Sequence, residues 1–166
     1  MTPAVAARAL RRRSPHGHAP APLRIASTLF GTLDVRPESV VHFTDGLFGF
    51  RDCLRFALVP TPRQAVFWLQ SVEHPTLAFL LVDPFHVAPG FSVELSDADL
   101  AAIEARTPED VAVLAIATLP KAAGETPTAN LQGPLAINVR QARGRQLAVG
   151  AGAFDTRCAF SLPAAG

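Results

Sequence analysis

Two cysteines and five histidines are the residues of this 166-residue chain that could act as nucleophiles, bases or metal ligands. A thiol beside an imidazole can form a nucleophile with its general base, and Cys53 and His42 fall in neighbouring predicted elements. A small buried thiol is the more common state of such a cysteine. Cys53 and Cys158 form neither a Cys-x-x-Cys pair nor a disulfide framework. A small hydrolase or isomerase using His42, Cys53 or His74 is therefore kept only as an alternative, to be tested by blocking the thiol.

The other histidines offer only weak metal-binding patterns. His74 and His86 follow predicted strands beside Glu73 and Asp83, and loop histidines next to acids are usually solvated and hydrogen-bonded. Residues 16–18 hold two more histidines without a further ligand nearby. The sequence lacks Gly-x-Gly-x-x-Gly, a P-loop, Gly-x-Ser-x-Gly and His-Glu-x-x-His. We therefore expect no catalytic residues, no metal site and no cofactor.

Basic residues are concentrated at the amino terminus. Residues 1–24 carry five of the 15 lysines and arginines and none of the 14 acids, which leaves a net charge of −4 for the rest of a chain whose total is +1. Residues 1–22 contain four prolines and no apolar periodicity, so we expect a disordered extension. Arginines 11–13 could neutralise phosphate, and a nucleic-acid-binding β-barrel using this arm is a second alternative. Because no apolar stretch follows them, a secretory signal is not indicated and we expect a cytoplasmic protein.

Residues 23–166 are expected to form mostly short strands, and these strands must position any functional site. The length predicts one domain, and 49% hydrophobic with 17% charged residues excludes a wholly disordered chain. The longest apolar runs, 77–82 and 111–119, are far shorter than the roughly 20 residues of a membrane helix. Alternating or continuous apolar patterns predict strands at residues 23–33, 40–43, 54–59, 65–72, 77–82, 111–119, 135–139 and 147–149.

Turn and helix signals complete this prediction. Gly31 is expected to form a bulge, Gly144 a turn, and residues 44–50 a glycine-rich corner. Ser96 and Asp99 have the spacing of a capping box at the start of a helix. With so few helices between the strands, repeated βαβ units are disfavoured. We predict a mainly β protein, a compact antiparallel β-barrel-like single domain with one or two short helices.

Two aromatic residues are candidates for surface contacts. Trp68 alternates out of phase with Phe67 and Leu69, so it is expected to face outward, where a tryptophan suits an interface anchor. Phe85 follows Asp83 and is expected in a loop, where it has little core to fill.

Several sequence blocks, taken in order, resemble one known family. The central block is Trp-Leu-Gln-Ser-Val-Glu at 68–73, then proline at 75, Leu-Ala-Phe at 77–79 and Asp-Pro-Phe at 83–85. Flanking blocks lie at 30–31, 43–50, 94–100, 130–131, 134–135, 137–138, 146 and 156–157. This ordered set covers about residues 28–158 and closely resembles the flagellar assembly factor FliW family. Thr44, Phe48 and Arg51 depart from the family pattern, which usually has prolines and an acid in this corner.

The resemblance implies a non-enzymatic cytoplasmic regulator. FliW proteins bind CsrA, an RNA-binding translational repressor, and antagonise its repression of flagellin messenger RNA. They also bind flagellin as a chaperone-like partner, which releases CsrA. The resemblance thus implies CsrA and flagellin as partners, no direct nucleic-acid or membrane binding, and a monomer when free; a flagellin-only chaperone is the alternative. The expected domains are the extension 1–22, a FliW-like β-barrel at 23–160 and a disordered tail at 161–166.

An acidic body can steer toward a basic partner, and an RNA-binding repressor is one. We therefore expect the partner interface where acids and aromatics gather on predicted loops and at the helix start. The predicted partner-binding residues are Trp68, Glu73, Asp83, Phe85, Glu94, Asp97 and Asp99. The helix acids can equally serve to complement the helix dipole.

Overall fold

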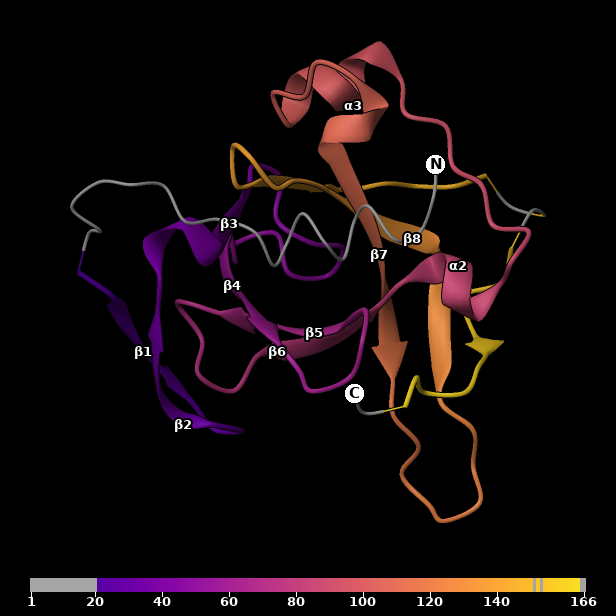
Figure 1. Ribbon diagram of the computed structural model, residues 1–166, viewed down its shortest axis with the longest axis horizontal. Helices are drawn as coiled ribbons and strands as arrows, with labels where there is room; N and C mark the ends of the chain where they lie inside the picture. Colours follow the sequence, from indigo (N-terminus) through magenta and orange to yellow (C-terminus); the bar gives the residue numbers. More distant parts are fainter. Residues whose placement is uncertain (1–20, 151, 153, 165–166) are drawn as a thin grey trace.

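The computed structural model describes residues 21–150, 152 and 154–164 (Figure 1). The predicted amino-terminal extension lies almost entirely outside these residues. The described strands are β1 (Leu23–Ser27), β2 (Gly31–Val35), β3 (Val40–Phe43), β4 (Arg55–Pro60), β5 (Val66–Ser71), β6 (Ala78–Val82), β7 (Val111–Thr118), β8 (Thr128–Asn138), β9 (Arg143–Gln146) and β10 (Cys158–Ala159). Two short helices are α2 (Pro84–Val87) and α3 (Asp97–Ala102), and 3₁₀ turns lie at Pro37–Ser39 and Pro108–Asp110.

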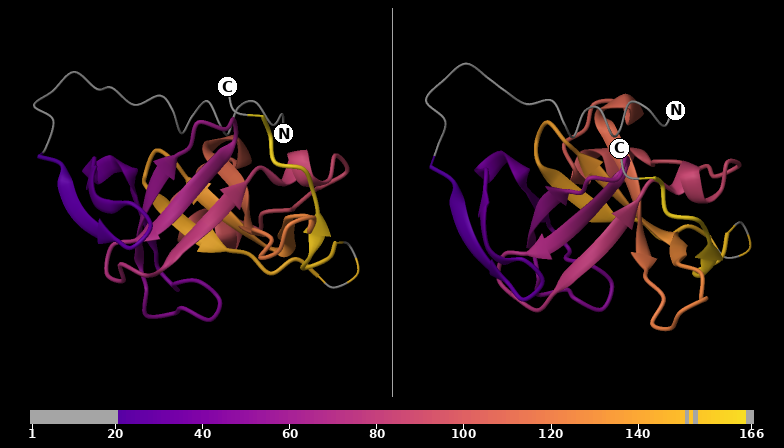
Figure 2. Two further views of the ribbon diagram at one scale, coloured as in Figure 1. Left: turned by 90° about the horizontal axis from the view of Figure 1, so that it is seen from below. Right: turned by 60° about the horizontal axis from the view of Figure 1, so that its bottom comes forward.

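Seven strands close into a barrel, in the order β8-β7-β6-β5-β4-β3-β9 and back to β8 (Figure 2). The mainly β, barrel-like fold predicted from the sequence is thus confirmed. One pairing differs from the antiparallel expectation, because β3 and β9 run parallel, with His42 opposite Arg143 and Phe43 opposite Gly144. That parallel pair joins the two ends of the sheet and closes the barrel. β10 pairs with the start of β8 at Thr128 and Ala129, on the edge away from β7, while the far end of that same edge pairs with β9.

The barrel interior is filled by alternate side chains of its strands. The buried cluster draws on β3 to β8 and contains Val41, Phe43, Leu47, Cys53, Phe56, Phe67, Leu69, Leu81, Leu114, Leu135 and Ile137. Phe43 and Phe56 meet edge to face, with ring centroids 5.7 Å apart. Gly144 belongs to β9, not to the turn that we predicted, because it pairs with both Phe43 and Ile137. A Cβ there would lie 2.5 Å from the Phe43 ring. The missing side chain therefore makes room for a core aromatic.

A second apolar cluster covers the outside of β5 to β8, where α2, α3 and the carboxy-terminal segment pack. The capping box predicted for α3 is confirmed: the Ser96 hydroxyl accepts from the Asp99 amide, and the Asp99 carboxylate accepts from the Ser96 amide. The backbone carbonyls of Ser161 and Pro163 accept hydrogen bonds from His86 and Arg63. No helix among the residues the structure describes has the length and apolar character needed to cross a membrane.

Three predicted elements were wrong in outline. Residues 23–33, predicted as one strand with a bulge at Gly31, form the hairpin β1–β2, because Gly31 takes a positive φ of 72° at the turn. Residues 147–149, predicted as a strand, follow β9 outside any named strand. The strand predicted at 135–139 is the end of the longer β8, whose register with β7 shifts between Leu114 and Ile116.

The β1–β2 hairpin packs against β4 outside the barrel (Figure 2).

Candidate protein-binding groove

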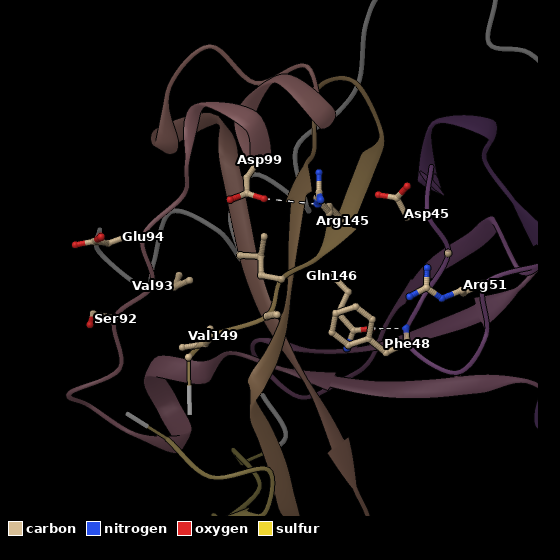
Figure 3. A pocket seen from close by; sticks show the side chains of 14 residues that line it. Asp45, Phe48, Arg51, Ser92, Val93, Glu94, Asp99, Arg145, Gln146 and Val149 are labelled. Carbon is tan, nitrogen blue, oxygen red and sulfur yellow. Dashed lines mark hydrogen bonds and ion pairs between the residues drawn. The ribbon is translucent and has the colours of Figure 1, made fainter. Parts of the chain in front are cut away.

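A groove of about 830 Å³ opens beside the barrel wall where β9 ends (Figure 3). Three segments line it: the corner after β3, the stretch before α3 with Asp99 of that helix, and the end of β9 with the residues that follow. The lining residues are Asp45, Gly46, Phe48, Arg51, Ser92, Val93, Glu94, Asp99, Arg145, Gln146, Leu147, Ala148, Val149 and Gly150. Phe48 is 53% exposed and forms part of the wall.

The corner is held in a fixed shape by its glycines and by Leu47. Gly46 has a φ of 65°, and a Cβ there would lie 2.5 Å from the backbone oxygen of Arg51. Only glycine tolerates both the left-handed backbone and this close approach. Leu47 is buried in the barrel interior, and its backbone bridges to Phe50. This arrangement directs Phe48 outward.

Gln146 ties the corner to strand β8. Its Oε1 accepts a hydrogen bond from the Phe48 amide at 2.7 Å, and its Nε2 donates to the Gly133 carbonyl at 2.9 Å. Gln146 is 9% exposed; its bond to Gly133 is buried, whereas its bond to the exposed Phe48 is only partly buried. The position of Phe48 therefore depends on a residue 98 positions away in the sequence.

The groove carries charges of both signs. Asp99 lies 3.5 Å from Arg145 and also belongs to the capping box. Asp45, Glu94 and Arg51 make no ion pair with any other described residue, and all three are exposed. The unpaired charge is thus two carboxylates against one guanidinium, which favours a ligand that carries basic groups.

Three of the seven predicted partner-binding residues lie in or next to this groove. Glu94 and Asp99 line it (Figure 3). Exposed Asp97 is the first residue of α3, the helix that carries Asp99. The role of Asp99 is partly structural, because it caps the helix as well as facing Arg145.

Trp68 lies on the barrel wall away from this groove. It is half-buried on the face opposite Phe67 and meets Phe30 edge to face, with ring centroids 5.7 Å apart. Gln70 fixes the turn that carries Phe30, because its Oε1 accepts from the Ser27 hydroxyl at 2.7 Å. Trp68 and Phe30 thus form a separate aromatic pair, not a wall of the groove.

The remaining predicted partner residues serve structural contacts. Glu73 pairs with Arg55 at 2.6 Å on the surface. Asp83 is only 7% exposed and caps α2 by accepting from the Phe85 amide, and burial raises the pKa of its carboxyl. Phe85 lies in α2, not in the loop that we predicted, and packs edge to face on Phe91 at 5.5 Å. Whether any of these residues also binds a partner stays a prediction.

Cys53 is poorly suited to act as a nucleophile. It is 6% exposed, and burial, with smaller effects from Glu73 and Asp52, raises the pKa of its thiol. The neutral thiol is far less reactive than the thiolate that nucleophilic catalysis needs. Among the residues that the structure describes, no group of three or more His, Cys, Asp or Glu side chains is placed to hold a metal ion.

Several groove residues escaped the sequence analysis as site candidates, notably Phe48, Arg51, Arg145 and residues 147–150. The sequence carries one signal for this site, because its glycines predict the corner around Gly46. What it could not give is that α3 and the end of β9 meet that corner in space.

Comparison with known proteins places this fold in one family. A family model described as FliW protein matches residues 24–160. The flagellar assembly factor FliW of Treponema denticola is 34% identical over 135 residues, which are 81% of this chain and 91% of the relative. That of Pseudothermotoga lettingae is 36% identical over 123 residues, 74% and 79% of the two chains. A crystal structure of the flagellar assembly factor FliW matches with a TM-score of 0.72 and 31% identity, covering 81% of this chain and 94% of the other. The chain described here therefore belongs to the FliW family of flagellar assembly factors.

Proposed function

We propose that this chain binds the RNA-binding repressor CsrA and thereby relieves its repression of flagellin messenger RNA. Flagellin binds the same chain as a chaperone-like partner, displaces CsrA and restores repression. The chain acts in the cytoplasm, as a free monomer between these complexes and without a cofactor. The observation that carries the proposal is the FliW match over residues 24–160, nearly all of the described chain.

The groove supports a binding role for this flagellar assembly factor. It combines an exposed aromatic side chain, Phe48, with the unpaired carboxylates of Asp45 and Glu94. An exposed aromatic beside uncompensated charge is typical of a surface that recognises another macromolecule. Antagonism then requires only that CsrA have a lower RNA affinity when this chain is bound, a coupling of a few kcal/mol.

The direct test is co-purification with the CsrA and the flagellin encoded by the same genome, followed by calorimetry on each pair. We expect both to bind, and flagellin to lower the occupancy by CsrA when all three are mixed. Binding of flagellin alone would instead support the flagellin-only chaperone. If neither protein bound, the proposal would be wrong.

A charge-reversal variant tests where CsrA binds. Glu94→Lys combined with Asp97→Lys is expected to weaken CsrA binding and to flatten its salt dependence, since exposed Glu94 lines the groove and exposed Asp97 starts helix α3, whose Asp99 also lines it. Asp34→Lys with Glu38→Lys is the control, because it changes the net charge equally on and beside β2, where it also removes surface ion pairs with Arg24 and Arg36. Equal weakening by both pairs at low salt would indicate only a general charge effect and would refute this placement.

A further inference from the structure

The barrel wall has an opening after β9. β9 lies between β8 and β3, and its pairing with β3 ends where Phe43 faces Gly144. β3 ends at Phe43, and the corner then leaves the wall, while residues 147–150 continue alongside β8. The groove lies between that corner and residues 147–150, since both segments line it. Figure 3 shows Phe48 of the corner and Val149 among the lining side chains.

Residues 147–150 are hydrogen-bonded on one side only. The amides of Leu147 and Val149 donate to the carbonyl oxygens of Pro134 and Gln132, each at 2.8 Å. In an extended segment, consecutive residues direct their backbone N–H and C=O groups to opposite sides. The backbone groups of Ala148 therefore face away from β8, toward the groove. Ala148 is exposed, and its amide donates to no other described residue.

Such an edge can accept a further strand. An unpaired row of backbone N–H and C=O groups is a template for an extended peptide, whose side chains then alternate between the two faces. The groove walls supply contacts for those side chains: the exposed Phe48 ring for an apolar one, and the unpaired carboxylates of Asp45 and Glu94 for a basic one.

We propose that an extended segment of CsrA adds as a strand along residues 147–150, with an apolar side chain on Phe48 and a lysine or arginine at Asp45 or Glu94. This inference rests on the proposed function, because it takes CsrA as the partner. The charge of the groove favours CsrA over flagellin, since a protein that binds RNA presents basic side chains. Backbone pairing would supply affinity, and the two wall contacts would supply specificity.

Amide hydrogen exchange of the ¹⁵N-labelled chain, free and bound to intact CsrA, tests strand addition directly. In the free chain we expect the amide of Ala148 to exchange much faster than those of Leu147 and Val149. Saturation with CsrA is expected to slow exchange at Ala148 at least tenfold. The exposed amide of Ala123, in the loop between β7 and β8, is the reference and should not change.

A variant supplies the second readout. Ala148→Pro removes the groove-facing donor without removing a hydrogen bond to another described residue, and it is expected to weaken CsrA binding at least tenfold. Asp34→Asn, which breaks only an exposed ion pair with Arg24, is the control and should change affinity less than twofold. Unchanged thermal unfolding of Ala148→Pro would show that the barrel is intact.

The outcomes separate this inference from the proposed function. If CsrA binds while exchange at Ala148 stays unchanged, strand addition is refuted and CsrA antagonism stands. If flagellin alone slows exchange at Ala148, the edge has a different occupant and the inference is wrong as stated. If CsrA does not bind at all, both the inference and the CsrA part of the proposed function fail.

Discussion

Replacing Gln146 by alanine should destabilise the protein substantially. The substitution removes the donor to the Gly133 carbonyl, which is buried, and the acceptor for the Phe48 amide. An unsatisfied buried carbonyl costs about 1–3 kcal/mol, and the loss of a hydrogen bond whose amide can still reach water costs about 0.5–1.5 kcal/mol. We therefore expect the free energy of unfolding to fall by about 2–4 kcal/mol.

Urea denaturation followed by circular dichroism measures this loss. Gln141→Ala is the matched control, because Gln141 is exposed in the turn before β9 and its change should stay within about 0.5 kcal/mol. For a domain of this size the Gln146 variant should also melt roughly 4–16 °C lower. If Gln146→Ala were as stable as Gln141→Ala, the view that Gln146 holds the corner against β8 would be refuted.

Three further predictions concern other parts of the fold. Gly46→Ala should destabilise more strongly in urea than Gly49→Ala: both glycines have positive φ, costing about 1–2 kcal/mol, but only at Gly46 would a Cβ meet backbone atoms. Wild-type stability relative to Asp83→Asn should fall as the pH rises above the ordinary aspartate pKa, because burial raises the pKa of Asp83 in the folded state; unfolding curves at several pH values measure this. Glu73→Gln should cost less than about 1 kcal/mol of unfolding free energy, since its pair with Arg55 is largely exposed.

The pH prediction for Asp83 has a definite sign. Between the unfolded pKa, near 3.8, and the raised folded pKa, the folded state binds more protons than the unfolded state, so stability falls with rising pH. The difference from Asp83→Asn should be constant below 3.8 and again above the folded pKa. A wild-type advantage that grew with pH would contradict the raised pKa. Equal effects of Gly46→Ala and Gly49→Ala, or a large loss in Glu73→Gln, would contradict the other two predictions.

The strands were largely predictable, because each depends on side-chain alternation over a few residues. Residues 65–72 and 77–82 of the prediction became β5 and β6, and 111–119 became β7. The first predicted strand failed because Gly31 was interpreted as a bulge within one strand, whereas its positive φ turns the chain back on itself. The last failed because residues 147–149 make only one-way bonds to β8: opposite them Pro134 has no N–H, and the Gln132 amide donates to the Asn130 side chain instead.

The candidate site was predictable only in part. The capping box depends on only two residues, Ser96 and Asp99, three positions apart, so the sequence predicted where α3 begins. Glu94 and Asp99 do line the groove, whereas Asp83 was chosen for its charge but is buried as a helix cap. The sequence alone does not distinguish an acidic residue that caps a helix from one that is exposed to a binding partner.

By itself the sequence determined the β class and the capped helix α3, because these rest on residues close together along the chain. It also carried the resemblance to FliW, because that rests on the order of short blocks and not on their contacts in space. Only the tertiary structure decided that β3 and β9 pair in parallel, that Gln146 reaches Phe48, and that the corner, α3 and residues 147–150 enclose one groove. The physical reason is the separation along the chain. Local residue spacing determines the backbone conformation of single helices and strands. The strand pair that closes the barrel and the groove both form between segments up to about a hundred residues apart, and no short sequence pattern predicts which distant segments will be in contact.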